Sequence, residues 1–165
     1  MTGFAPTDRL ARVRLLEDRP RLRTPEIQQE LDVAIYDLIE ANCFRPLPRG
    51  EEPVPAGPYV LGMGMADRML LMDVRTEADE TVIELRLSLS PLRGVIKDYF
   101  AICESYFDAV KRLPPSRIEA IDMGRRGVHD EGAAILAERL SGKVETDRTT
   151  ARRLFTLICA LQFRG

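Results

Sequence analysis

Residues 59–90 read YVLGMGMADRMLLMDVRTEADETVIELRLSLS and contain three runs in which apolar side chains occupy every second position. Short turn segments at 66–68 and 77–80 separate the runs. Alternation with a period of two is typical of strands that bury one face, and connections this short join antiparallel neighbours. The stretch therefore predicts an antiparallel meander with one face toward the core and the other toward water.

The sequence before the meander predicts one further strand, one helix and a loop. Residues 11–16, ARVRLL, alternate apolar residues with arginine and suit a half-buried strand. The segment 24–26, TPE, is a typical capped helix start, and apolar residues then recur at three- and four-residue steps through about Ala41. Residues 44–58 hold five of the eleven prolines and are interpreted as a connecting loop.

The sequence after the meander predicts mainly helices. Ser90 followed by proline begins a long helix, which carries four of the ten aromatic residues and is expected to lie across the sheet. The box SRIE, residues 116–119, and Asp147 are expected to cap two later helices. The expected elements are helices over 91–111, 116–123, 130–140 and 148–163, with a short strand over 143–146.

These elements predict an α+β fold, in which an antiparallel meander sheet of three to five strands is packed by about four or five helices. With 165 residues, 45% apolar and 30% charged, residues 1–165 are expected to form a single domain. The longest apolar runs, of four or five residues, are far shorter than the roughly 20 that cross a membrane. The first ten residues, MTGFAPTDRL, do not match a signal peptide, so a cytoplasmic location is expected.

Charge and cysteine content exclude several classes of partner. The 24 basic and 26 acidic residues nearly cancel, which gives no global field for nucleic acid or acidic membranes, although 21 of the basic residues are arginine. The three cysteines, Cys43, Cys103 and Cys159, form no CxxC pattern and are expected to be buried free thiols. With one histidine, the chain lacks a typical zinc ligand set, and no metal or cofactor is predicted.

The segment DMGRRGVHDEG, residues 122–132, is the most suggestive candidate site, because it places charged residues and the one histidine at a predicted junction between two helices. Paired guanidinium groups suit a carboxylate or phosphate, and a histidine beside a carboxylate suits acid–base chemistry. In the structural alternative, Asp130 caps a helix and the glycines form a turn. The candidate anion or partner site comprises Asp122, Arg125, Arg126, His129 and Glu131.

Two further segments are candidate sites. Arg148, Arg152 and Arg153 form a candidate basic patch for RNA or an acidic partner, although no aromatic residues are interleaved with them for base stacking. Gly62 and Gly64 lack the third glycine of a phosphate loop and are expected to leave room for a helix or a ligand packed over the sheet. The sequence contains no GxSxG motif, which weakens an enzyme interpretation.

Four segments together resemble the uncharacterised protein family UPF0262, which is found mainly in alphaproteobacteria. They are IYDLIE (35–40), LRGVIKDYFAICESYFDAV (92–110), IEAIDMGRRGVHDEGA (118–133) and ARRLFTLICALQFRG (151–165). The resemblance extends from about residue 24 to residue 165. It implies a small cytoplasmic bacterial protein and assigns no activity, substrate or catalytic residue.

Three function hypotheses remain open from the sequence. The first is a non-enzymatic regulatory or protein-interaction protein that uses residues 122–132. The second is a small enzyme or anion-binding protein with its site at the same junction. The third is RNA association through the arginines of the last helix. A homodimer would be favoured by an uncovered strand 11–16 or by exposed Met63 and Met65.

Overall fold

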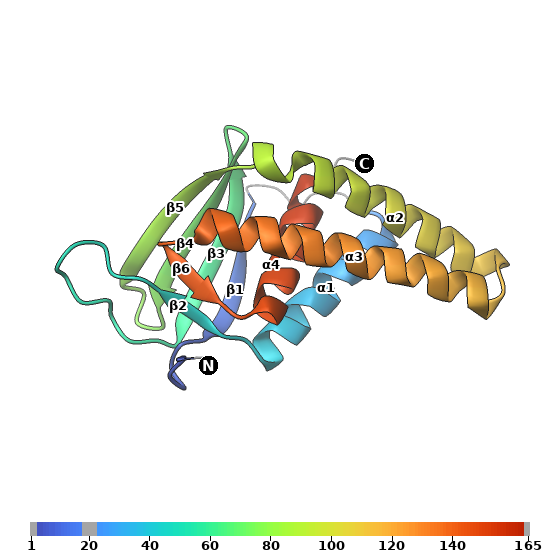
Figure 1. Cartoon of the computed structure of the whole chain (residues 1–165). Coiled ribbons are helices and arrows are strands. Elements are labelled where there is room, and N and C mark those ends of the chain that lie inside the picture. Colours follow the sequence, from blue (N-terminus) through green and yellow to red (C-terminus); the bar gives the residue numbers. More distant parts are fainter. Residues whose placement is uncertain (1–2, 18–22, 164–165) are drawn as a thin grey trace.

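A four-stranded sheet is covered on one face by helices (Figure 1). The computed structural model describes residues 3–17 and 23–163, so most of the loop after the first strand lies outside the described residues. The elements are β1 (Leu10–Leu16), α1 (Pro25–Glu40), β2 (Phe44–Pro46), β3 (Tyr59–Ala66), β4 (Met69–Thr76), β5 (Thr81–Ser88), a 3-10 turn (Ser90–Leu92), α2 (Arg93–Arg112), α3 (Pro115–Leu140), β6 (Val144–Thr146) and α4 (Arg148–Gln162).

The sheet has the strand order β1-β3-β4-β5 and confirms the α+β prediction. Strands β3, β4 and β5 form the predicted antiparallel meander, in which Met63 pairs with Met72 and Met72 with Leu85. Strand β1, however, runs parallel to β3, so the sheet is mixed and the strictly antiparallel prediction is wrong. The cause is the long connection through α1, since a crossover of this length allows the chain to re-enter the sheet in the same direction.

A second, two-stranded sheet pairs β2 with β6 in antiparallel register. The strand predicted over 143–146 is confirmed, but the interpretation of 44–58 as loop throughout is wrong for the first three residues. Phe44, in that stretch, is fully buried. Three residues are too few to display a period, and the partner strand lies about a hundred positions away, opposite Phe44 at Thr146.

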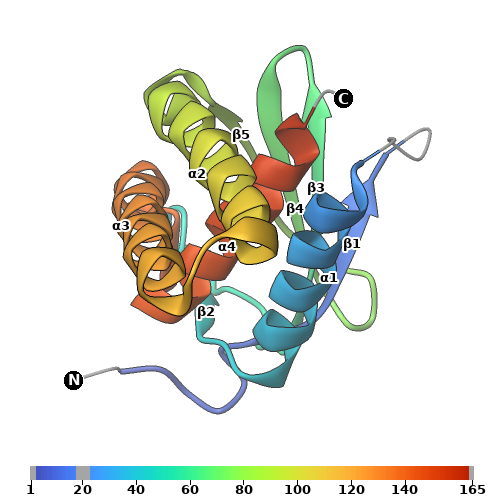
Figure 2. The ribbon, with the colours of Figure 1, turned by 90° about the vertical axis from the view of Figure 1, so that its right-hand side faces the viewer.

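Helix α4 occupies the centre of the helical layer, between α1 on one side and α2 and α3 on the other (Figure 2). Every residue from Leu154 to Leu161 is buried, as the nearly unbroken apolar run predicts. The expectation that the aromatic helix is the main one over the sheet is therefore only partly met. Helix α2 contributes Tyr99 and Cys103 to the core but keeps an exposed face.

Side-chain caps define two helix starts as the sequence predicts. Thr24 Oγ1 accepts a hydrogen bond from the Ile27 amide at 3.2 Å, and Asp147 Oδ1 accepts one from the Thr150 amide at 2.9 Å. The expected capping box at 116–119 is wrong, because α3 begins one residue earlier, with proline in its first turn and no side-chain cap. Proline is favoured there, since its missing amide has no intrahelical partner in any case.

Helix α3 runs unbroken from Pro115 to Leu140, so the two predicted helices and the junction between them are wrong. Asp130 lies in the middle of this helix rather than at a cap. An interior glycine costs about 1 kcal/mol relative to alanine, which lowers helix propensity without forbidding a helix. At Gly132 the missing side chain lets α3 approach α4, because a Cβ there would lie 2.5 Å from ring carbons of Phe155.

The glycines of β3 serve the sheet itself and not a helix or ligand laid over it. A Cβ at Gly64 would lie 2.6 Å from the Leu16 carbonyl oxygen, and one at Gly62 would lie 3.1 Å from the Leu16 side chain. Exposure of Met63 and Met65 would have favoured a homodimer. Met63 is fully buried, so it gives no support for one. Within the described ranges, no helix combines the length and apolar character needed to cross a bilayer.

Two single variants, Gly127→Ala and Gly132→Ala, test whether α3 is continuous. A methyl group at Gly127 meets no atom within 4 Å, so we expect Gly127→Ala to stabilise the protein by about 0.5–1 kcal/mol. Gly132→Ala forces Phe155 to move and is expected to destabilise by about 1–3 kcal/mol. Urea unfolding followed by circular dichroism measures both. Loss of stability in Gly127→Ala would contradict a helix that continues through residue 127.

Candidate functional site

The lining residues of three cavities place a groove between α1 and the hairpin of α2 and α3. Figure 2 shows the arrangement of these helices, with α4 between them. The three cavities adjoin along the groove, with volumes of about 680, 410 and 240 Å³. The first and second share Glu26 and Phe107, and the second and third share Glu30 and Arg125. Because the linings overlap in this way, we treat the three cavities as one feature, the α1 groove.

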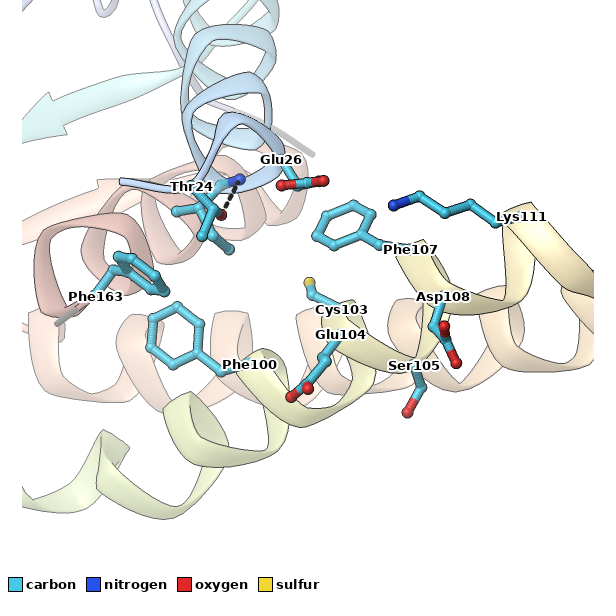
Figure 3. A pocket seen from close by; sticks show the side chains of 11 residues that line it. Thr24, Glu26, Phe100, Cys103, Glu104, Ser105, Phe107, Asp108, Lys111 and Phe163 are labelled. Carbon is cyan, nitrogen blue, oxygen red and sulfur yellow. Dashed lines mark hydrogen bonds between the residues drawn. The ribbon is translucent and has the colours of Figure 1, made fainter. Parts of the chain in front are cut away.

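The end of the α1 groove near the start of α1 is lined by aromatic side chains together with charged ones (Figure 3). Phe100, Phe107 and Phe163 line it together with the Cys103 thiol. Cys103 Sγ lies 3.7 Å from Glu30 Oε1, to which it donates a hydrogen bond. Burial, reinforced by the Glu30 charge, raises the pKa of Cys103 to about 12, so the thiol stays protonated and unreactive at neutral pH.

The rim of the α1 groove carries apolar side chains that face water. Val33 on α1 is 47% exposed and Val110 on α2 is 52% exposed, and both line the middle cavity. Among the described residues, the exposed large apolar side chains all lie in the helical layer or at its ends: Val33, Tyr36, Val110, Leu113 and Met123. The apolar surface of this protein is thus concentrated on its helices and not on the outer face of the sheet.

Arg125 connects α3 to α1 at the middle of the groove. Its Nη1 donates to Glu30 Oε1 at 2.6 Å, and its Nε donates to Asp122 Oδ1 at 3.3 Å. The guanidinium carbon lies 4.6 Å from the centroid of the Tyr106 ring, within cation–π range. Two carboxylates and one aromatic ring therefore fix this guanidinium in place.

His129 lies one helical turn further along the same face of α3. Its ring stacks on Tyr99 with centroids 5.4 Å apart and meets the edge of Phe155 at 6.3 Å. Burial, reinforced by the positive charges of Arg125 and Arg152, lowers the pKa of His129 to about 4. The ring is therefore neutral at pH 7, and its buried Nε2 has no hydrogen-bond partner among the described residues.

Two arginines of α4 reach the polar end of the groove. Arg152 Nε lies 3.2 Å from Asp130 Oδ1 as an ion pair, without the geometry of a hydrogen bond. Arg153 Nη1 donates to the carbonyl oxygens of Asp37 at 3.0 Å and Ala41 at 3.1 Å. A cation at these carbonyls stabilises the last turn of α1 because it complements the negative end of the helix dipole.

The structure brings together some of the predicted site residues and separates others. Asp122, Arg125 and His129 share the face of α3 that points toward α1 and α4, as their i, i+3, i+7 spacing in one helix requires. Arg126 is 71% exposed and pairs with Asp122. Glu131 is exposed and lines none of the three cavities.

The candidate anion site and the candidate basic patch, predicted as separate sites, share one cavity. Arg152 and Arg153 of the predicted basic patch line the same 240 Å³ cavity as Arg125 and His129. The third member of that patch, Arg148, is exposed and does not line it. Among the described residues, no three histidine, cysteine or carboxylate side chains are grouped closely enough to hold a metal ion.

Sequence reasoning missed the contribution of α1 to the site. Glu26, Glu30, Val33 and Asp37 follow one another at three- and four-residue steps beside the apolar stripe of that helix. The spacing places them on one edge of α1, but it does not indicate that α2 and α3 lie opposite. A charged edge on an amphipathic helix is more often simply solvated.

The fold and the groove define a small α+β protein whose concave surface is built by helices. The chain belongs to the uncharacterised protein family UPF0262, whose family model matches residues 7–164. The match includes β1, which the resemblance drawn from the sequence left out. No solved structure matches this chain significantly.

The relatives are similar over nearly their whole length. A UPF0262 protein of Roseobacter denitrificans is 59% identical over 142 residues, which cover 86% of this chain and 89% of the relative. One of Cereibacter sphaeroides is 55% identical over 157 residues, covering 94% and 99%. One of Paracoccus denitrificans is 53% identical over 154 residues, covering 93% and 95%.

The titration of His129 tests the geometry of the polar end. The folded pKa of about 4 lies below the ordinary value of 6.5, so between these two values the unfolded chain binds more protons. The free energy of unfolding is therefore expected to fall as the pH drops from 6.5 toward 4. Proton NMR of the His129 ring measures the midpoint directly, because the chain has one histidine.

The variant His129→Gln provides the control for that titration. It removes the ionisable ring, so the dependence of stability on pH between about 5 and 6.5 should flatten. A titration midpoint near 6.5 in the folded wild-type protein would show instead that the ring is in contact with water.

Proposed function

We propose that this protein is a non-enzymatic, cytoplasmic regulatory protein that binds an amphipathic helix of a partner protein in the α1 groove. The observation that carries the proposal is the continuous groove with water-exposed apolar side chains on both rims, Val33 and Val110. Such side chains gain free energy when an apolar partner covers them.

The shape of the α1 groove favours a helix over a small molecule. It follows α1, whose 16 residues span about 24 Å at 1.5 Å per residue. Small-molecule sites enclose most of the ligand surface, whereas the rim residues here stay about half exposed. Recognition of an amphipathic helix in a groove instead uses an elongated, open surface with apolar positions at its base.

The charges along the groove define which helix fits. The end near the start of α1 is lined by three carboxylates, those of Glu26, Glu104 and Asp108, and by one ammonium group, that of Lys111. The opposite end carries three arginines and two carboxylates. A complementary partner helix therefore has basic residues at one end and an acidic residue at the other, which fixes its direction in the groove.

The other two hypotheses receive less support. Arg152 and Arg153 already have an ion-pair partner and two carbonyl acceptors, so RNA phosphates would compete with these internal contacts. For an enzyme, a general base needs an orienting hydrogen bond. The buried Nε2 of His129 has none within the described part of the chain.

Binding of a synthetic helical peptide tests the proposal. The peptide carries leucines at i, i+3, i+4 and i+7 positions, basic residues in one terminal turn and acidic residues in the other. We expect it to bind the protein, and the double variant Val33→Gln with Val110→Gln to bind about tenfold more weakly, because two partly buried apolar contacts are lost. Fluorescence anisotropy of the labelled peptide measures the affinity.

The matched control is the double variant Tyr36→Gln with Met123→Gln. These two side chains are 67% and 66% exposed and line none of the three cavities, so the affinity should stay at the wild-type value. Equal weakening in both double variants, or equal binding of a peptide with the same composition in scrambled order, would reject the groove as the binding surface.

A further inference from the structure

We propose that the 240 Å³ cavity at the polar end of the α1 groove binds a single carboxylate group, and that an acidic side chain of the partner helix supplies it. This inference rests on the proposed function and assigns the anchoring contact of that interaction. The residues that carry it come from three helices: Glu30 and Asp37 of α1, Arg125 and His129 of α3, and Arg152 and Arg153 of α4.

The charge of the cavity suits a monoanion. The residues that line it are three arginines, two carboxylates and a neutral histidine, whose charges sum to +1. Asp122 and Asp130, outside the lining, pair with Arg125 and Arg152. A carboxylate balances this charge, whereas a phosphate group carries a charge of about −1.5 to −2 at neutral pH. Planar guanidinium groups also match the two oxygens of a carboxylate.

The hydrogen bonds already made inside the cavity identify the donors that remain. The guanidinium of Arg125 is held by Glu30 and Asp122, and Arg153 donates to the carbonyl groups at the end of α1. Within the described residues, the side chain of Arg152 donates no hydrogen bond, and its Nε is a buried atom without a hydrogen-bond partner. Arg152 forms an ion pair with Asp130 but donates no hydrogen bond there, so it is the arginine with the most donor capacity left for a ligand.

His129 supplies the second donor. Its Nε2 is buried without a partner and its ring lines the cavity. A buried polar atom that has lost its contact with water and has gained no partner is unfavourable, and an acceptor placed in the cavity removes that cost. A neutral imidazole can carry its hydrogen on Nε2, so a carboxylate oxygen selects that tautomer.

Protonation of His129 is coupled to occupancy of this carboxylate site. In the empty protein, burial and the facing cations Arg125 and Arg152 lower the His129 pKa, and Asp122 and Asp130 oppose this effect. The other ionisable groups nearby are Glu30, on the opposite wall, and Tyr99, which is stacked on the ring.

A bound carboxylate adds a negative charge beside the ring, which raises the His129 pKa above about 4. Carboxylate binding is consequently expected to tighten as the pH falls toward that range.

Titration of the full chain with sodium acetate tests the inference without the partner helix. Proton NMR follows the His129 ring, with sodium chloride at equal ionic strength as the reference. We expect saturable shifts and a raised His129 pKa with acetate. Arg152→Gln should weaken acetate binding about tenfold or more through the lost charge-assisted hydrogen bond, while Arg126→Gln, at the exposed neighbour, should leave it unchanged.

Three outcomes would overturn the carboxylate assignment. They are the absence of any acetate effect beyond that of chloride, equal losses in Arg152→Gln and Arg126→Gln, and tighter binding of inorganic phosphate than of acetate. Circular dichroism confirms that each variant is folded, and Arg152→Lys, which keeps the charge, should retain part of the acetate binding.

The acetate and peptide experiments test the two proposals independently of each other. Val110 lines the middle cavity and not the 240 Å³ cavity, so Val110→Gln should bind acetate as the wild type does. Peptide binding without acetate binding would leave the helix proposal standing and reject the carboxylate site. Acetate binding without peptide binding would support the carboxylate site and reject the helix proposal.

Discussion

Burial of α4 on all its sides is the constraint on which the rest of the structure depends. From Leu154 to Leu161 every residue of this helix is buried and Thr156 is the one polar side chain, so its neighbours must remove nearly the whole circumference of this segment from water. The inner face of the sheet shares one core with it, and α1 and α3 pack along its flanks. Because α1 and the hairpin of α2 and α3 each pack on α4 without covering one another, the α1 groove remains between them.

Polar contacts across the groove hold its walls in place. Arg125 ties α3 to Glu30 of α1, and Arg153 ties α4 to the end of α1. Both arginines hold neighbouring helices together through hydrogen bonds, whereas Arg152 pairs with Asp130 as an ion pair and donates no hydrogen bond within the described residues. The same cluster of charges thus gives a rigid wall and a polar surface that can accept an acidic group, which is the combination that a binding groove needs.

Much of the fold follows from local sequence patterns, and much of the candidate site does not. The period-two runs in 59–90 and the caps at Thr24 and Asp147 predict three strands and two helix starts, because these signals depend only on near neighbours. The continuity of α3 is missed, since three glycines lower helix propensity and the compensating contact of Gly132 with Phe155 comes from a distant helix. Asp122, Arg125 and His129 are named as site residues, but their partner Glu30 is 95 positions from Arg125.

Local sequence patterns alone predict an α+β protein with a meander sheet, a last helix that contains a nearly unbroken apolar run, and two candidate segments that contain arginine. Periodicity and capping are local, so they can be read without knowledge of the neighbours. Only the tertiary structure decided that β1 joins the sheet in parallel and that Arg125, His129, Arg152 and Arg153 line one cavity. Those arrangements depend on how three helices pack around α4, and packing between residues far apart in the chain leaves no periodic signal in the sequence.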